Sequence, residues 1–92
     1  MYQSKFANRE LDLLFDAVLS LKNKEECYRF FEDLCTVYEL TSLSQRLEVA
    51  RLLYEKKTYA EIGALTTAST ATISRINRSL EYGADGYPIV FE

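Results

Sequence analysis

The most informative features of this sequence are the residue types it lacks. Its 92 residues include no histidine, no tryptophan, three glycines and one proline. So few turn-forming residues argue against a protein built of strands and tight turns. Without histidine, and with nothing spaced like a set of metal ligands, the sequence predicts no metal site. The length predicts one small, mainly helical domain.

Catalytic and membrane-spanning patterns are also missing. Acidic residues are scattered over predicted helix surfaces, with no paired nucleophile and base and no glycine-rich phosphate loop, so we expect no enzyme. No apolar run approaches the ~20 residues of a membrane span, and the start is too polar for a signal peptide. Cys27 and Cys35 lie on one predicted helix, roughly 12 Å apart, too far for a disulfide. We expect reduced core thiols in a cytoplasmic protein.

Apolar residues, in contrast, are abundant. They make up 48% of the sequence, with seven tyrosines and five phenylalanines among them. A lone chain of this length buries only a modest core. We therefore expect an obligate dimer, in which a second copy covers part of the apolar surface.

Capping residues predict where the helices begin. An Asn, Ser or Thr followed three residues later by Glu or Gln marks three helix starts, and Asn8 with acidic residues in the next turn marks another. Apolar residues at helical spacing fill the stretches between them. The predicted helices run from about Asn8 to Leu21, from Asn23 to Tyr38, from Leu43 (after the cap Ser42) to Glu55, and from Thr58 onward.

Helical spacing also predicts which residues face the core. The first helix is apolar on more than one face, because Leu13 and Leu19 lie off its main stripe, which suggests contact with a second subunit. In the later helices the expected core residues are Leu43, Leu47, Ala50, Tyr54, Ile62, Leu65, Ile73, Ile76 and Leu80.

The stretch Thr58–Leu80 has the pattern of a helix-turn-helix. We expect its first helix at about 59–65, a polar turn at 66–68 and its second helix at about 69–79. Such a turn often needs glycine for a positive φ, but that place holds Thr67. A β-branched residue would be strained there, so we expect either a looser turn or a register shifted by one.

The second helix of this motif carries the side chains of a DNA recognition helix. Short hydroxyl groups can bond base edges and phosphates, an alanine can meet a thymine methyl group, and two arginines lie further along. Serine and threonine are mediocre helix formers, so DNA reading explains them better than an inert helical hairpin. Two preceding lysines contact phosphates or cap the helix before them. The candidate DNA-binding residues are Lys56, Lys57, Ser69, Thr70, Ala71, Thr72, Ser74, Arg75 and Arg78.

The net charge of −3 is unevenly distributed. Residues 1–41 carry five basic and eight acidic groups, residues 42–80 carry six and three, and residues 81–92 carry three acidic groups. The only net-positive segment therefore contains the proposed recognition helix. This asymmetry favours double-stranded DNA as a partner, although chance produces similar swings in helical proteins.

The C-terminal residues change character. Gly83 suits a helix C-cap, and Pro88 forbids an immediate helix, so we expect a docked tail. The predicted organisation is a single domain over 1–92, with dimerisation and core helices at 8–56, the helix-turn-helix at 58–80 and the tail at 81–92.

Several strings of residues match a known family. They are L-T at Leu40-Thr41, RLEVARLL from Arg46, E-I at Glu61-Ile62 and, above all, ATISRINRSL at Ala71–Leu80. The chain resembles the Trp repressor family, and more closely its YerC/YecD-like branch of small bacterial proteins. The resemblance implies an all-α, five-helix domain with a helix-turn-helix, in an intertwined homodimer whose two heads enter successive major grooves.

The resemblance also implies a ligand site, because in Trp repressor tryptophan sits between the core and each head. The family's ligand-contacting residues are similar to Thr72, Arg75 and Ser79, and its second arginine most resembles Arg46. A pocket for tryptophan or a related small ligand is therefore implied. The alternative is that both arginines are plain surface or phosphate-contacting residues. This chain departs from the family in a shorter segment before Arg46, in Thr67 and Ser69 at the glycines of the turn, and in its tail.

Two hypotheses follow. The first is a sequence-specific DNA-binding transcriptional regulator, a repressor, that acts as a homodimer and is modulated by a small amino-acid-like ligand. The alternative is a protein-interaction or dimerisation module that has the helix-turn-helix shape without specific DNA binding. A positive band joining both second helices of a dimer would favour the first, and an acidic or mosaic face would favour the second.

Overall fold

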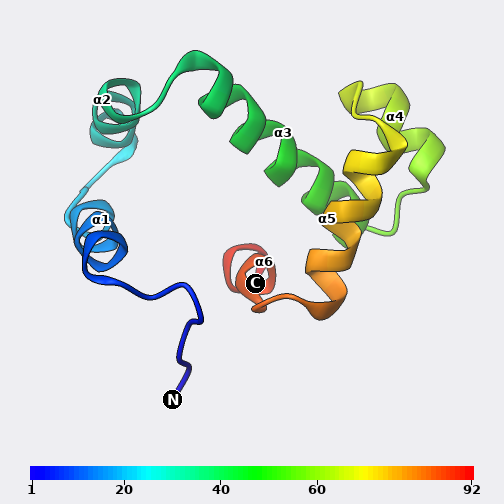
Figure 1. Ribbon diagram of the computed structural model, residues 1–92. Coiled ribbons are helices and arrows are strands. Elements are labelled where there is room, and N and C mark those ends of the chain that lie inside the picture. The colour runs from blue at the N-terminus through cyan, green and yellow to red at the C-terminus, as the bar shows by residue number, and fades with distance from the viewer. The chain divides into compact units, whose positions relative to one another are not determined.

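The computed structural model describes residues 1–92 and contains six α-helices and no β-strand (Figure 1). The expected all-α fold is confirmed. None of the helices is both long and apolar enough to cross a membrane. Two compact units divide the chain at residue 37. The first unit contains α1 (Arg9–Leu19) and α2 (Lys24–Leu34), and the second is built from α3 (Val37–Tyr54), α4 (Tyr59–Thr66), α5 (Thr70–Tyr82) and α6 (Gly86–Phe91).

The helices of the first unit begin at the expected caps. Asn8 Oδ1 accepts the backbone N–H of Leu11 at 2.8 Å, and Asn23 Oδ1 accepts that of Glu26 at 2.9 Å. The Glu26 carboxylate accepts the N–H of Lys22, at 2.9 Å, rather than that of the cap itself. These bonds satisfy donors that the first turn of a helix leaves free.

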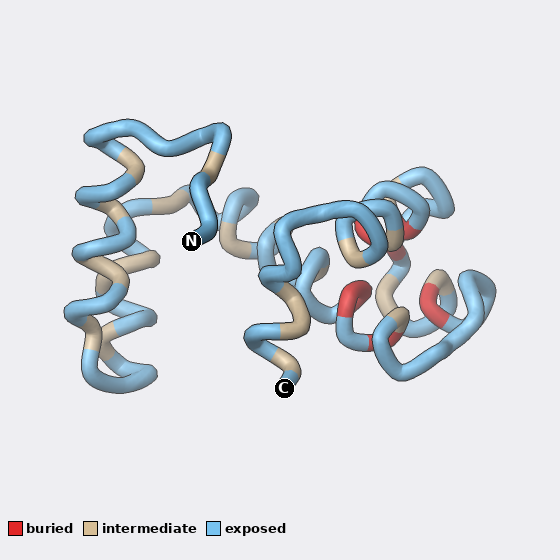
Figure 2. The backbone as a smooth tube through the Cα atoms, turned by 90° about the horizontal axis from the view of Figure 1, so that it is seen from below, coloured by how far each residue is buried: buried red, intermediate tan, exposed pale blue.

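No residue of the first unit is buried, as the absence of red on α1 and α2 shows (Figure 2). Phe30 and Phe31 meet edge to face at 5.5 Å, but Leu19 remains 83% exposed. Both cysteines are free, and Cys27 is exposed, so the expectation that it is a core thiol was wrong for the single chain. A unit of this size is too small to be stabilised by its own core.

The third helix begins earlier than the sequence indicated. It starts at Val37 rather than at Leu43, so the predicted cap Ser42 lies inside it, and α2 ends earlier, at Leu34. No glycine or proline interrupts the segment between Val37 and Ser42. The capping preference of a single serine does not stop a helix whose neighbours can continue it.

The core lies in the second unit, where α3, α4, α5 and the turn between α4 and α5 contribute the buried residues shown in red (Figure 2). All of them are apolar and of small or medium size. No buried polar side-chain atom of the structure lacks a hydrogen-bond partner. The buried residues are Val49, Ala50, Leu52, Ile62, Ala68, Ile73 and Ile76.

Four residues that we expected in the core are exposed in the single chain. Leu65 is 66% exposed, and Leu43, Leu47 and Tyr54 are exposed by smaller fractions. Helical spacing marks an apolar face but does not say whether the same chain covers it. These positions on α3 and α4 therefore present apolar surface.

The C-terminal tail contains a short helix that the sequence did not predict. Pro88 is the third residue of α6, where its missing N–H costs no helical hydrogen bond, so the expectation that it would exclude a helix was wrong. The tail does dock. Tyr87 and Phe91 stack at 6.0 Å and pack against the core, and Phe91 meets Tyr54 at 5.3 Å. The Tyr54 hydroxyl donates to the Glu92 carboxylate, which raises the pKa of Tyr54.

Candidate functional site

The first helix of the helix-turn-helix, α4, is fixed at its start by a complete capping box. The Glu61 N–H donates to Thr58 Oγ1 at 3.1 Å, and the Thr58 N–H donates to Glu61 Oε1 at 3.0 Å. The bond from the Thr58 backbone, then that from its side chain, lowers the pKa of Glu61 below its ordinary 4.5, and Lys57 adds to the shift.

The turn between the helices is made by Thr67 itself. Its backbone is left-handed, with φ 60° and ψ 11°, and its N–H donates to the Gly63 carbonyl at 3.0 Å. Thr67 therefore occupies the left-handed position of the turn at the expected register. The turn is neither looser nor shifted by one residue. A side chain on Gly63 would meet only the Ala68 carbonyl oxygen, at an ordinary 3.8 Å. The strained position of the motif is therefore Thr67.

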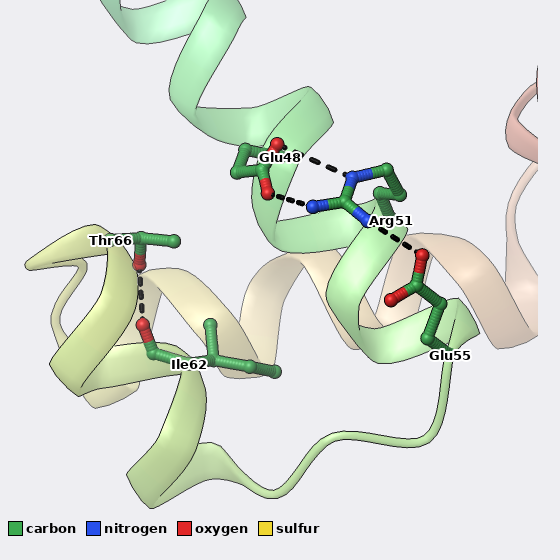
Figure 3. Close-up of polar contacts among 5 residues, drawn as sticks. All are labelled: Glu48, Arg51, Glu55, Ile62 and Thr66. Carbon is green, nitrogen blue, oxygen red and sulfur yellow. Dashed lines mark hydrogen bonds and ion pairs between the residues drawn. The ribbon is translucent and has the colours of Figure 1, made fainter.

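Hydrogen bonds brace this turn from several directions. Thr66 Oγ1 donates to the Ile62 carbonyl at 2.7 Å (Figure 3) and accepts the Ala68 N–H at 3.2 Å. The Gln45 amide donates to the Thr66 carbonyl at 3.3 Å, which ties α3 to the end of α4. With Ala68 buried, these bonds fix the angle at which α5 begins.

The second helix, α5, has one buried face and one open face. Ile73 and Ile76 are buried, and Ser69 caps the helix by accepting the Thr72 N–H at 3.1 Å. Thr72 is half-buried at the border. The remaining predicted DNA-binding residues of the helix are all exposed and recur at helical spacing on the opposite arc. They are Thr70, Ala71, Ser74, Arg75 and Arg78.

The two predicted lysines lie in the connection between α3 and α4. Both are exposed, and Lys56 has a left-handed φ of 69°. Arg51, in the last turn of α3, is held by Glu48 and by Glu55, the latter at 2.6 Å (Figure 3). Neither Lys56 nor Lys57 has such a partner, so their ammonium groups are the unpaired cations at this end of α3.

The residues assigned to a ligand by resemblance line one cavity of about 340 Å³. One comes from α3 and three from α5, where spacings of three and four residues place them on one side. Neither arginine makes an ion pair within the chain, so both guanidinium groups are available to an anion. The lining residues are Arg46, Thr72, Arg75 and Ser79, together with Ile76 and Tyr87.

Sequence reasoning missed Tyr87 as a wall of this cavity. Ile76 was expected in the core, where it also lies. Tyr87 reaches the cavity only because α6 folds back onto α3 through Phe91 and Tyr54. No local pattern in the sequence signals such a long-range contact.

Known proteins are similar to this chain in sequence and in fold. The sequence matches the family described as Trp repressor protein over residues 9–92. Protein YerC of Bacillus subtilis (strain 168), described as uncharacterised, is 56% identical over 92 residues, which are 100% of this chain and 88% of YerC.

Two crystal structures resemble the chain closely. A candidate Trp repressor from Staphylococcus aureus superposes with a TM-score of 0.88 at 56% identity, covering 94% of this chain and 86% of that one. A TrpR-like protein from Eubacterium eligens gives a TM-score of 0.90 at 57% identity, covering 95% and 90%. The chain thus belongs to the Trp repressor family, a family of helix-turn-helix regulators, and to its YerC-like branch.

Proposed function

We propose that this chain is a sequence-specific DNA-binding transcriptional regulator, a repressor, that acts as a homodimer. The observation that carries the proposal is the open face of α5, where hydroxyl, methyl and guanidinium groups are exposed opposite the buried Ile73 and Ile76. A helix of this kind fits the major groove, where each base pair presents a distinct pattern of donors, acceptors and methyl groups.

The exposed side chains of α5 differ in length, and therefore in which parts of the DNA they can contact. Thr70 and Ser74 bear short hydroxyls that need close approach to base edges, while Ala71 offers a methyl group to thymine. Arg75 and Arg78 are long enough to reach guanine or phosphate. Lys56, Lys57 and Ser69 would contribute phosphate contacts that position the head.

A homodimer would supply the cover that the first unit lacks. Because no residue of α1 or α2 is buried, a second copy interlocked through these helices gives their apolar faces a partner. We retain a single domain per chain, with residues 8–56 in dimerisation and core. Two heads on one face would address half-sites roughly 34–36 Å apart.

A binding selection on random duplexes tests DNA recognition. We expect a near-palindromic site, and weakened binding in Arg75→Ala. Binding that is weak, salt-sensitive and indifferent to sequence would contradict specific regulation.

We further propose that a small amino-acid-like ligand, such as tryptophan, binds between Arg46 and Arg75 and modulates the heads. Both arginines line one cavity and lack ion-pair partners, which supports a ligand site. Calorimetry with tryptophan should give heat that Arg46→Ala or Arg75→Ala removes. A flat titration of the unmodified chain would dismiss tryptophan.

Two observations favour the alternative, a protein-interaction module without specific DNA binding. Leu65, on the first helix of the motif, is 66% exposed, and the chain has a net charge of −3. The same duplex selection separates the two functions, since an interaction module would enrich no site.

A further inference from the structure

A polar side chain of α3 bonds directly to the end of α4. The Gln45 amide donates to the Thr66 carbonyl at 3.3 Å. Thr66 is the last residue of α4, where a helix leaves its final carbonyls without helical partners. The Thr67 hydroxyl donates to the same carbonyl at 2.5 Å, so that oxygen accepts two hydrogen bonds. Gln45 therefore caps α4 from a neighbouring helix.

Gln45 extends the face of α3 that packs against α4 and α5. Val49 and Leu52, four and seven residues further along, lie on the same side of the helix and are buried. Their core cluster includes Ile62 of α4 and Ile73 of α5. Apolar burial draws these surfaces together without fixing their orientation, because it is non-directional. A hydrogen bond weakens steeply as its angle closes, so the bond of Gln45 adds the orientation that apolar contact lacks.

The head, by which we mean α4, α5 and the turn between them, is thus attached to α3 at two places. One is the covalent connection after Tyr54, where the Lys57 N–H donates back to the Leu52 carbonyl at 3.0 Å. The other is Gln45, which lies roughly 14 Å from that end of α3 along the helix axis. Without this second attachment, a rotation of about 10° at the connection would move the end of α4 by about 2 Å, which is more than a hydrogen bond to a base tolerates.

The carbonyl that Gln45 holds lies close to the start of the recognition helix. Only two residues separate Thr66 from Ser69, the cap of α5. The second of them, Ala68, is buried, and its N–H donates to Thr66 Oγ1 at 3.2 Å. A displacement of Thr66 would therefore be passed on to the first turn of α5, where Thr70 and Ala71 are exposed.

We propose that Gln45 is a positioning residue for DNA recognition, which holds the head at the angle that lets α5 reach base edges. Gln45 acts through the Thr66 carbonyl and does not itself contact DNA. This role rests on the proposed DNA-binding function and extends it to a residue of α3, outside the helix-turn-helix.

Base reading depends on this angle more than phosphate binding does. A hydrogen bond to a base edge needs donor and acceptor within about 2.7–3.2 Å. The charges of Lys56, Lys57 and Arg78 attract phosphates over a longer range, about 8–10 Å at moderate salt. Loss of the Gln45 bond should therefore weaken specific binding and leave non-specific binding in place.

Gln45→Met tests the proposal, because methionine keeps the length of the side chain and lacks the N–H donors. Loss of one hydrogen bond of typical net strength should lower the population of correctly held heads about fivefold, so a dimer should bind its selected site about 25-fold more weakly. Affinity for an unrelated duplex, and its slope with salt, should not change in fluorescence anisotropy. Residual dipolar couplings should show α4 and α5 turned together relative to α3. Gln3→Met, the same change at an exposed position of the first unit, is the matched control.

Two further variants separate positioning from stability. Gln45→Lys returns an N–H donor beside the negative end of α4, so it should restore the couplings and the ratio of specific to non-specific affinity. Gln45→Glu keeps the size of glutamine, but its carboxylate can only accept a hydrogen bond. It should therefore behave as Gln45→Met does, and it carries the same test if the methionine variant does not fold.

Several outcomes would overturn the role of Gln45. They are unchanged couplings in Gln45→Met, an equal loss of affinity for both duplexes, and a failure of Gln45→Lys to restore specific affinity. An unmodified chain that selects no site at all would instead contradict the proposed function. A selected site that Gln45→Met binds as tightly as the unmodified chain does would reject only the positioning role.

Discussion

At Thr67 the chain places a β-branched residue in the left-handed region, φ 60°, which costs an L-residue about 1–2 kcal/mol. The left-handed conformation of Thr67 is held because the hydroxyl of Thr66 and the amide of Gln45 make hydrogen bonds within and to the turn. Strain of this kind is stored where the angle between two helices is fixed by surrounding contacts.

Replacing Thr67 by glycine should therefore stabilise the protein. Glycine adopts positive φ without a Cβ clash, so we expect Thr67→Gly to raise the free energy of unfolding by about 1 kcal/mol, measured by urea denaturation. Thr66→Gly is the control: it removes two hydroxyl bonds from a helical position and should destabilise. A less stable Thr67→Gly would show that the threonine is not strained.

Arg75 and Arg78 lie one helical turn apart but have different surroundings. Arg75 lines the cavity that Arg46 also lines, whereas Arg78 lies over the Tyr82 ring, 5.9 Å from its centroid, towards the end of α5. The position of Arg78, far from the helix start that enters the groove first, favours a phosphate contact over base reading.

Arg78→Ala should weaken binding to specific and unrelated duplexes by similar factors. The slope of log affinity against log salt should become shallower by about one per head, or about two for a dimer, measured by fluorescence anisotropy. Ligand heat should be unchanged in this variant, whereas Arg75→Ala should lose it. A loss of affinity confined to the selected site would instead place Arg78 on a base.

At the same scale, sequence and structure agree where spacing along one helix decides the contact. Thr72, Arg75 and Ser79 share a cavity because their spacing on α5 places them on one side. All three were assigned to a ligand from family resemblance, as was Arg46, for which no local rule connects α3 with α5. Tyr87 escaped prediction because its place depends on how α6 packs.

At the scale of elements, capping chemistry located most helix starts. Asn8, Asn23 and Thr58 act as caps as expected, and Ser69 caps α5 although no capping signal predicted it. Ser42 did not, because an equally plausible local signal was overridden by continuation of α3. A cap can be recognised from a few neighbouring residues, whereas the point at which a helix ends depends on packing along its whole length.

The capping box of α4 should make stability depend on pH in a defined window. The folded-state pKa of Glu61 is lowered, so its stabilising contribution is present above 4.5 and is lost as the pH falls through the lowered value. Urea denaturation of the unmodified chain and of Glu61→Ala should differ at pH 6, and the difference should shrink towards pH 3. Glu32→Ala, at an exposed position of α2 outside the box and outside the ion pairs, is the control. A difference independent of pH would show that the Glu61 carboxylate does not cap α4.

At the scale of the whole molecule, helical periodicity revealed the apolar faces but not what covers them. Ala50, Ile62 and Ile76 are buried within the chain, whereas Leu43 and Leu47 are exposed in it. Both groups show the same spacing in the sequence. The difference arises from tertiary and quaternary contacts, which a periodic pattern does not encode.

Leu19, 83% exposed on α1, gives the sharpest test of the proposed dimer. In a monomer, Leu19→Glu would be a surface change worth within about 0.5 kcal/mol. In a dimer joined through α1 and α2 it would bury a charge at the interface and favour dissociation. Sedimentation equilibrium should give twice 10.6 kDa for the unmodified chain and a lower mass for this variant. Unfolding of the unmodified chain should shift to higher temperature with protein concentration, as it does when association and folding are linked.

Lys22→Glu, a charge change in the exposed connection after α1, is the control and should retain the dimer. An unmodified chain that is monomeric would contradict the proposed dimer. A Leu19→Glu variant that remains dimeric would place the interface elsewhere.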